Sequence, residues 1–191
     1  MNITILNLYL YKKKSKIVDA IKIGYKFISK YVSYWSWLNS DDELYDEHTL
    51  QIVRDHMWKM NNPELLYGKG IYVKENETKN VNVCKEHETN PIDTLLTRVG
   101  ICQPSLYMKS NNEKIEKCLI NLEESMVFDY ELWIKLAFEH VQFKYINHNL
   151  LKYNFTNINI TKGLLITNSS LENIIQISSF LGFKQFIRLG F

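Results

Sequence analysis

In the stretch YWSWLNSDD, residues 34–42, an aromatic strand ends and two carboxylates follow directly. Residues 31–38 are aromatic and β-rich, which predicts a buried strand, and residues 39–42 form a polar, acidic loop after it. Open α/β sheets bind their ligands at the carboxyl ends of the strands. Asp41 and Asp42 are therefore candidate ligands for a Mg²⁺ or Mn²⁺ ion that also holds phosphate oxygens. The competing interpretation is an exposed turn or a helix N-cap.

Helices and strands alternate outward from this stretch. Apolar residues at helical spacing predict a helix over residues 15–29 before it and another over 46–60 after it. The second helix is expected to end at residues 61–63, Asn-Asn-Pro, because proline cannot extend it. Further helices are predicted over residues 91–98, 113–119, 129–140 and 170–187, a polar loop over 74–90, and strands over 65–73, 104–109, 142–146 and 150–155, the last two paired across 147–149. This alternation predicts an α/β fold.

Composition excludes several classes of protein. The length of 191 residues suits a single domain over 1–191, and 46% hydrophobic against 23% charged residues is typical of a globular chain. Lys and Arg number 23 against 21 Asp and Glu, so the net charge of +2 gives no field that would attract nucleic acid. No apolar stretch approaches the roughly 18 residues that a membrane span needs. We therefore expect neither nucleic-acid binding nor a transmembrane segment.

The cysteines and histidines show no disulfide or metal pattern. The chain has three cysteines, an odd number, and none has CxxC spacing with another: Cys84, Cys102 and Cys118. This pattern is typical of a protein in a reducing compartment. Basic residues follow the apolar ones at the start of the chain, the reverse of a secretory signal, so we expect a cytoplasmic location. His48 and His56 are eight residues apart, two helical turns, which is too far for one ion. Exposed or capping roles are expected for both.

A second acidic candidate is Asp129, which begins the helix predicted over residues 129–140. The helix dipole favours an ionised carboxylate at that position. An ionised aspartate that faces a cleft could act as a general base. The alternative is a helix N-cap followed by ordinary core packing of Leu132 and Trp133.

Taken in order, these motifs resemble family 2 glycosyltransferases of the GT-A fold over about residues 15–165. The matching segments are DAIKIG (19–24), YWSWLNSDD (34–42), NP (62–63) followed by LYG (66–68), ICQPS (101–105), DYELWIKLA (129–137), FKYI (143–146) and NITK (159–162). The resemblance implies a truncated, Rossmann-related mixed sheet flanked by helices. It also implies that a sugar passes with inversion from a UDP- or GDP-linked donor to a hydroxyl of a glycan, lipid or protein acceptor.

The resemblance further implies roles for particular residues. The acidic pair corresponds to the family's DxD-type motif, so Asp42 would hold Mn²⁺ or Mg²⁺ on the donor diphosphate. Asp41 would contact the donor ribose or assist the metal. Asp129 falls where the family keeps its catalytic base, which would deprotonate the acceptor hydroxyl. Asp19 matches the family's donor-proximal helix and would help to bind the donor. Gln103 and Trp133 match positions on the acceptor side.

The chain also departs from the family. Two strand–helix units that cradle the nucleotide base are missing, and Lys22 and Lys30 stand where the family has asparagine and glycine. The chain is therefore expected to be an enzyme completed by another chain or an upstream segment, or a catalytically inactive remnant that serves as a binding module. An enzyme that holds its donor through the metal alone is disfavoured, because the base would lack a pocket. The missing part of the sheet predicts an exposed strand edge that pairs with another chain or a second copy. Residues 166–191 are expected to form a C-terminal helix.

Overall fold

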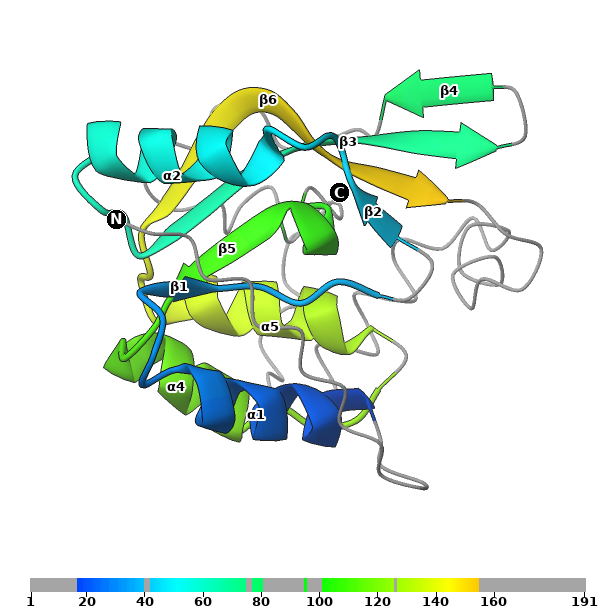
Figure 1. Cartoon of the computed structure of the whole chain (residues 1–191). Coiled ribbons are helices and arrows are strands. Elements are labelled where there is room, and N and C mark those ends of the chain that lie inside the picture. Colours follow the sequence, from blue (N-terminus) through cyan, green and yellow to red (C-terminus); the bar gives the residue numbers. More distant parts are fainter. Residues whose placement is uncertain are drawn as a thin grey trace, which may run out of the picture.

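A mixed sheet with helices on both faces forms the part of the chain that the computed structural model describes, residues 17–39, 42–74, 77–80, 95, 101–125 and 127–154 (Figure 1). In chain order the elements are α1 (Ile17–Ile28), β1 (Tyr34–Trp35), β2 (Asp42–Leu44), α2 (Thr49–Lys59), β3 (Leu65–Lys74), β4 (Glu77–Asn80), the 3₁₀ helix η1 (Gln103–Ser105), β5 (Leu106–Lys109), α4 (Glu113–Ile120), α5 (Phe128–Phe138) and β6 (Phe143–Asn154). The strand order is β1-β5-β3-β6-β2, with β4 paired to β3 beside this path. The expected α/β class is confirmed.

Several predicted features lie outside the described residues. These are Asp41, the predicted C-terminal helix over 166–191, and all but Leu95 of the helix predicted over 91–98. Among the helices that the structure describes, none is both long enough and apolar enough to cross a membrane.

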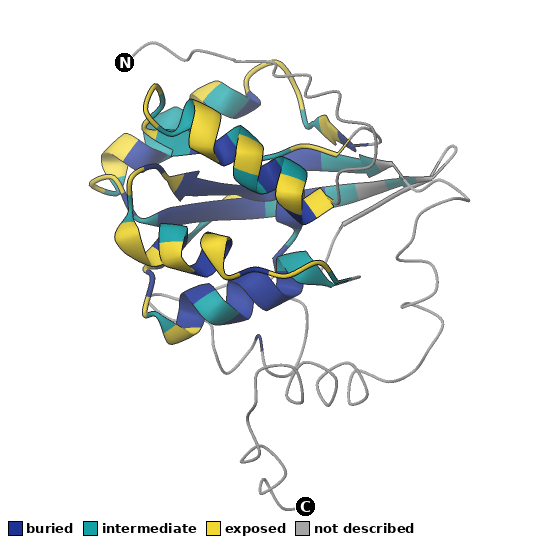
Figure 2. Ribbon diagram, turned by 90° about the horizontal axis from the view of Figure 1, so that it is seen from below, coloured by how far each residue is buried: buried dark blue, intermediate teal, exposed yellow. Residues whose placement is uncertain are grey.

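Alternating side chains give the sheet two buried faces. In β3, Leu65 and Tyr67 belong to the larger core, which α1, α4 and α5 cover, whereas Leu66 packs with Val53 and Met57 of α2 on the opposite face. Successive strand residues point to opposite faces, so a sheet covered on both sides requires a continuous apolar run. Figure 1 shows α2 above the sheet and the other three helices below it. In Figure 2, seen from below, the helices turn their exposed residues outward and their buried residues toward the sheet.

Asparagines mark two helix ends. Asn61 and Asn62 follow α2 with φ angles of 57° and 55°, the left-handed conformation that asparagine tolerates better than most residues. The predicted stop after residue 60 is thus confirmed. At the start of α4, the Asn112 side chain accepts hydrogen bonds from the backbone N–H groups of Lys114 and Ile115, both at 3.1 Å. These contacts satisfy two of the donors that a helix start leaves unpaired.

The predicted pair of strands over 142–146 and 150–155 is wrong. The structure has one continuous strand, β6, which lies parallel to β3 along its length. Asn147, His148 and Asn149 are polar and turn-prone, which suggested a hairpin, but they are accommodated as an irregularity in the β3–β6 pairing. The long neighbour β3 pairs with β6 on both sides of this irregularity, which a local turn signal cannot anticipate.

Three further predictions need correction. The strand predicted over 31–38 is only two residues long in β1, because pairing with β5 ends at Trp35. Asp42 does not lie in a loop but begins β2, which pairs antiparallel with the far end of β6. Part of the predicted polar loop over 74–90 forms β4, a hairpin partner of β3. Each difference arises from pairing between strands distant in the sequence or from a hairpin without a glycine turn signal.

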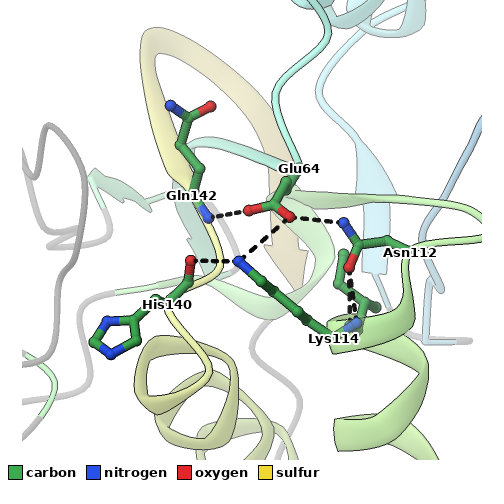
Figure 3. A network of polar contacts seen from close by, with 6 residues as sticks. Glu64, Asn112, Lys114, His140 and Gln142 are labelled. Carbon is green, nitrogen blue, oxygen red and sulfur yellow. Dashed lines mark hydrogen bonds and ion pairs between the residues drawn. The ribbon is translucent and has the colours of Figure 1, made fainter.

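Glu64 joins three elements at the end of the sheet where β3 and β6 begin and β5 ends (Figure 3). Its carboxylate accepts hydrogen bonds from Nδ2 of Asn112 at 2.8 Å and from the backbone N–H of Gln142 at 2.7 Å. Lys114 Nζ lies 3.9 Å from the same carboxylate and donates to the His140 carbonyl at 3.1 Å. One side chain therefore links the cap of α4 to the starts of two central strands.

Glu64→Ala is expected to lower the free energy of unfolding by about 1–3 kcal/mol, because the Asn112 amide and the Gln142 N–H lose their charged acceptor. Equilibrium urea denaturation measures the change. Glu47→Ala, which removes a glutamate whose side chain is 87% exposed, is the control and should change stability by less than about 0.5 kcal/mol. Equal losses in the two variants would show that the network has no specific stabilising effect.

Candidate active site

Asn39 connects two buried polar side chains at one end of the sheet. Its Nδ2 donates to Oδ2 of Asp42 at 3.0 Å and to Oε1 of Gln103 at 3.1 Å. Gln103 Nε2 in turn donates to the Trp37 carbonyl at 2.7 Å. The orientations of both amides follow from this chain of contacts, because a carboxylate and a carbonyl only accept hydrogen bonds. Asp42 and Gln103 are 6% and 7% exposed, whereas Asn39 itself is exposed, so the network joins a surface residue to two buried side chains.

Local backbone structure brings these side chains together. The N–H of Asp42, at the start of β2, donates to the Asn39 carbonyl at 3.1 Å. Gln103 begins η1, and Ser105 at the end of η1 donates from Oγ to the Gly68 carbonyl of β3 at 2.9 Å. Figure 1 shows β2, η1 and the start of α5 at the same end of the sheet, on its right-hand side.

Asp129 lies in the first turn of α5, where its Oδ1 accepts the N–H of Tyr130 at 2.8 Å. Burial raises the pKa of its carboxyl, and hydrogen bonds from backbone N–H groups oppose that shift only in part. Burial also raises the pKa of the Cys102 thiol, and the negative charges of Asp42 and Asp129 raise it further. The Cys102 thiol therefore stays protonated and unreactive.

Aromatic rings pack around Trp37, whose backbone carbonyl belongs to the Asn39 network. The ring centroid of Trp37 lies 5.9 Å from that of Trp35, 5.9 Å from that of Trp133 and 6.3 Å from that of Phe128. Such pairs stabilise a core beyond the area that they bury. Trp133 is 1% exposed and belongs to the main core cluster. Its role in this structure is to stack on the ring of Trp37, whose backbone carbonyl Gln103 binds, and acceptor contact stays a prediction.

The structure gathers only some of the residues predicted from the sequence. Asp42 and Gln103 share the Asn39 network, and Asp129 lies in the first turn of α5, whereas Asp19 is exposed in the first turn of α1 and takes no part in the hydrogen bonds described above. The predicted donor-binding roles of Asp19 and Asp41 stay predictions.

Sequence reasoning missed two members of this site. Asn39 lies inside the motif that carries the acidic pair, and Cys102 is next to Gln103. Asparagine is common in loops and cysteine is common in cores, so neither residue type alone indicates a functional site. Only the neighbouring residues in the sequence could have indicated that Asn39 and Cys102 belong to one. A polar residue three positions before a buried aspartate is close enough to reach it across one turn, and that spacing is the clue that was available.

The oxygen donors fit a hard divalent cation that is shared with a ligand. Across the described ranges, no group of three or more His, Cys, Asp or Glu side chains could hold a metal ion by itself. Mg²⁺ and similar ions are commonly held by only one or two carboxylates, with phosphate oxygens and water completing the coordination. The Asp42 carboxylate, restrained by Asn39, suits an ion of that kind.

Comparisons with known proteins support the fold. No protein-family model matches the chain, and no curated protein matches its sequence. Among solved structures, the crystal structure of the glycosyltransferase S. aureus TarS is similar to the chain, with a TM-score of 0.54 and 13% sequence identity. The match covers 85% of this chain and 30% of the TarS chain, so this chain matches less than a third of the length of TarS. The likeness shows a glycosyltransferase-like fold.

Proposed function

We propose that this chain acts as a glycosyltransferase, which transfers a sugar with inversion from a nucleotide-sugar donor to a hydroxyl of a glycan, lipid or protein acceptor. The observation that carries the proposal is the Asn39 network, which restrains the buried Asp42 carboxylate at the end of a glycosyltransferase-like sheet. A site with one carboxylate for cation binding and a second for proton transfer is what the reaction requires.

Asp129 is the proposed general base. As the acceptor hydroxyl oxygen attacks the anomeric carbon, its proton passes to the Asp129 carboxylate. The bond from that carbon to the nucleotide diphosphate breaks on the opposite face, which inverts the configuration. The raised pKa of Asp129 makes its ionised form a stronger base than an exposed aspartate.

Asp42 is the proposed ligand for Mn²⁺ or Mg²⁺ at the donor diphosphate. Asn39 would keep the Asp42 carboxylate in one orientation, and Gln103 would hold Asn39. When bound, the ion supplies positive charge that stabilises the departing nucleotide diphosphate. Since the chain matches 30% of TarS, a partner chain or a further segment is proposed to supply the remaining contacts to the nucleotide.

Titration calorimetry with UDP and GDP tests the proposal. We expect binding in the presence of Mn²⁺, little heat with Mn²⁺ alone, and an affinity at least about tenfold lower in Asp42→Ala and Asp42→Asn. Asp42→Asn keeps the size of the side chain and an oxygen for Asn39, so its loss of binding would report the missing charge. Asp55→Ala, on the partly exposed surface of α2, is the control.

The pattern of results separates the two candidate functions. Metal-dependent nucleotide binding that is lost in both Asp42 variants would support the transferase. Folded protein that binds neither nucleotide would contradict an enzyme that works alone and favour the inactive binding module, and mixing with candidate partner chains would then be the next step. Binding that is unchanged in Asp42→Asn would exclude Asp42 as the ligand.

A further inference from the structure

Two histidines on α2 and β6 face each other on the side of the sheet that α2 covers. The ring centroids of His56 and His148 lie 4.9 Å apart, with an interplanar angle of 63°. His56 is half-buried and His148 is exposed. The sequence-based search for a metal pair compared His56 with His48, because those two share a helix, and the partner that the fold supplies instead lies 92 residues further along the chain (148 − 56 = 92).

A backbone contact selects the tautomer of His56. Its Nδ1 lies 2.9 Å from the carbonyl oxygen of Ile52, one turn earlier in α2. A carbonyl can only accept a hydrogen bond, so Nδ1 carries the proton and the lone pair of the neutral ring is on Nε2. Histidines that bind metals commonly donate their second ring N–H to a backbone carbonyl in this way, which fixes the ring and makes the free nitrogen more basic.

A β-bulge brings His148 to α2. Pairing shifts from Tyr67↔Tyr145 to Lys69↔Asn149, so β6 advances four residues where β3 advances two. Gly68 lies opposite this bulge, and a Cβ there would come within 2.8 Å of the His148 carbonyl oxygen and 2.6 Å of Leu150 Cδ1. The missing side chain at Gly68 thus makes room for the bulge. Bulges of this kind redirect a side chain from its ordinary strand position.

The separation of the rings agrees with bidentate coordination of one ion. Two imidazole nitrogens at about 2.0–2.1 Å from a tetrahedral Zn²⁺ place the ring centres roughly 5 Å apart. The observed centroid distance is 4.9 Å. Imidazole nitrogen is a ligand for Zn²⁺, Ni²⁺ and Cu²⁺ rather than for the hard ions that carboxylates bind.

We propose that His56 and His148 form a two-histidine site for a divalent transition-metal ion such as Ni²⁺ or Zn²⁺, with water or an external ligand in the remaining positions. The site is independent of the proposed transferase site, because it uses other residues and another class of ion. Two protein ligands make a weak, open site, and its open positions can accept a histidine or carboxylate from another molecule.

Calorimetric titration of the full chain with Ni²⁺ alone tests the site. We expect one bound ion, with affinity reduced at least about tenfold in His56→Ala and in His148→Ala. His48→Ala is the matched control, since His48 lies beside the same helix with a side chain 67% exposed, and its affinity should stay at the wild-type value. Ni²⁺ should also raise the Tm of the wild type and of His48→Ala but not that of the two other variants.

A second measurement separates this site from binding by thiols. In NMR spectra with Zn²⁺, the ring nitrogens of His56 and His148 should shift together, with the His56 response at Nε2. Circular dichroism and the urea midpoint check that each variant is folded, and His148→Gln serves if His148→Ala is not. The proposal would be overturned if the wild type did not bind Ni²⁺ or if both alanine variants kept the wild-type affinity. It would also be overturned if His48→Ala lost as much Ni²⁺ affinity as those variants.

Discussion

Asp129→Asn is expected to stabilise the folded protein at neutral pH while it lowers transfer activity by about 10²–10⁴-fold. The reason for the stabilisation is that burial raises the pKa of the Asp129 carboxyl, which means that the folded state disfavours its charged form. Asparagine has nearly the same shape and carries no charge to bury. The reason for the loss of activity is that an amide cannot take a proton from the acceptor hydroxyl.

The sign of the pH dependence follows from the direction of the Asp129 pKa shift. The folded protein binds the Asp129 proton more tightly than the unfolded chain, so the contribution of this group to stability is fully present below the unfolded pKa of about 4. That contribution is lost as the pH rises through the folded pKa. Asp129→Asn should therefore gain stability over the wild type only above this window, and the two proteins should converge in more acidic solution.

Urea denaturation at several pH values measures the stability, and release of UDP or GDP from a panel of nucleotide sugars measures the activity. Asp55→Asn, on the surface of α2, is the control and should change stability by less than about 0.5 kcal/mol at every pH. A variant at position 129 that is less stable than the wild type at neutral pH would contradict a surrounding that disfavours the charged carboxylate. If Asp129→Asn were stabilised and the wild type itself showed no transfer activity, the inactive binding module would be favoured.

Trp133→Ala is expected to destabilise the protein by about 3–5 kcal/mol, because it removes one of the largest buried side chains and leaves a cavity. The indole is 1% exposed and stacks on Trp37 at 5.9 Å between centroids. Since Trp37 supplies the carbonyl that Gln103 binds, the cavity would also loosen the Asn39 network. Urea denaturation followed by circular dichroism measures the loss.

Trp58→Ala provides the comparison for this prediction. Trp58 lies on α2 and is 81% exposed, so its removal should change stability by less than about 0.5 kcal/mol. Trp133→Phe keeps an aromatic ring in the cavity and should lose less than Trp133→Ala. If Trp133→Ala and Trp58→Ala lost similar amounts, the packing of α5 against the sheet would differ from that described.

Local signals predicted the helices well. Helical periodicity placed helices over 15–29, 46–60 and 129–140, and the structure has them as α1, α2 and α5. The stop at residues 61–63 follows from asparagine and proline chemistry within a few residues, and it is confirmed by two left-handed asparagines. These features depend on neighbours in the sequence, so one sequence is enough to find them.

Pairing between distant segments was predicted less well. The start of β2 at Asp42 depends on residues 151–153 of β6, and the continuity of β6 depends on β3. Turn-prone residues 147–149 favoured a hairpin, but a parallel partner on one side and β2 on the other stabilise the single strand. Register between distant strands is determined by which faces are buried and by the competing partners, and neither is visible in a local window.

The sequence by itself determined the α/β class, the helices, and the candidate carboxylates Asp42 and Asp129. Apolar periodicity and turn chemistry act over a few residues, so the amino-acid order alone carries them. The tertiary structure was needed to show that Asn39 links Asp42 to Gln103 and that two distant histidines meet across a bulge. Those contacts join residues that lie far apart in the chain, and they form because burial of two sheet faces leaves the segments one compatible arrangement.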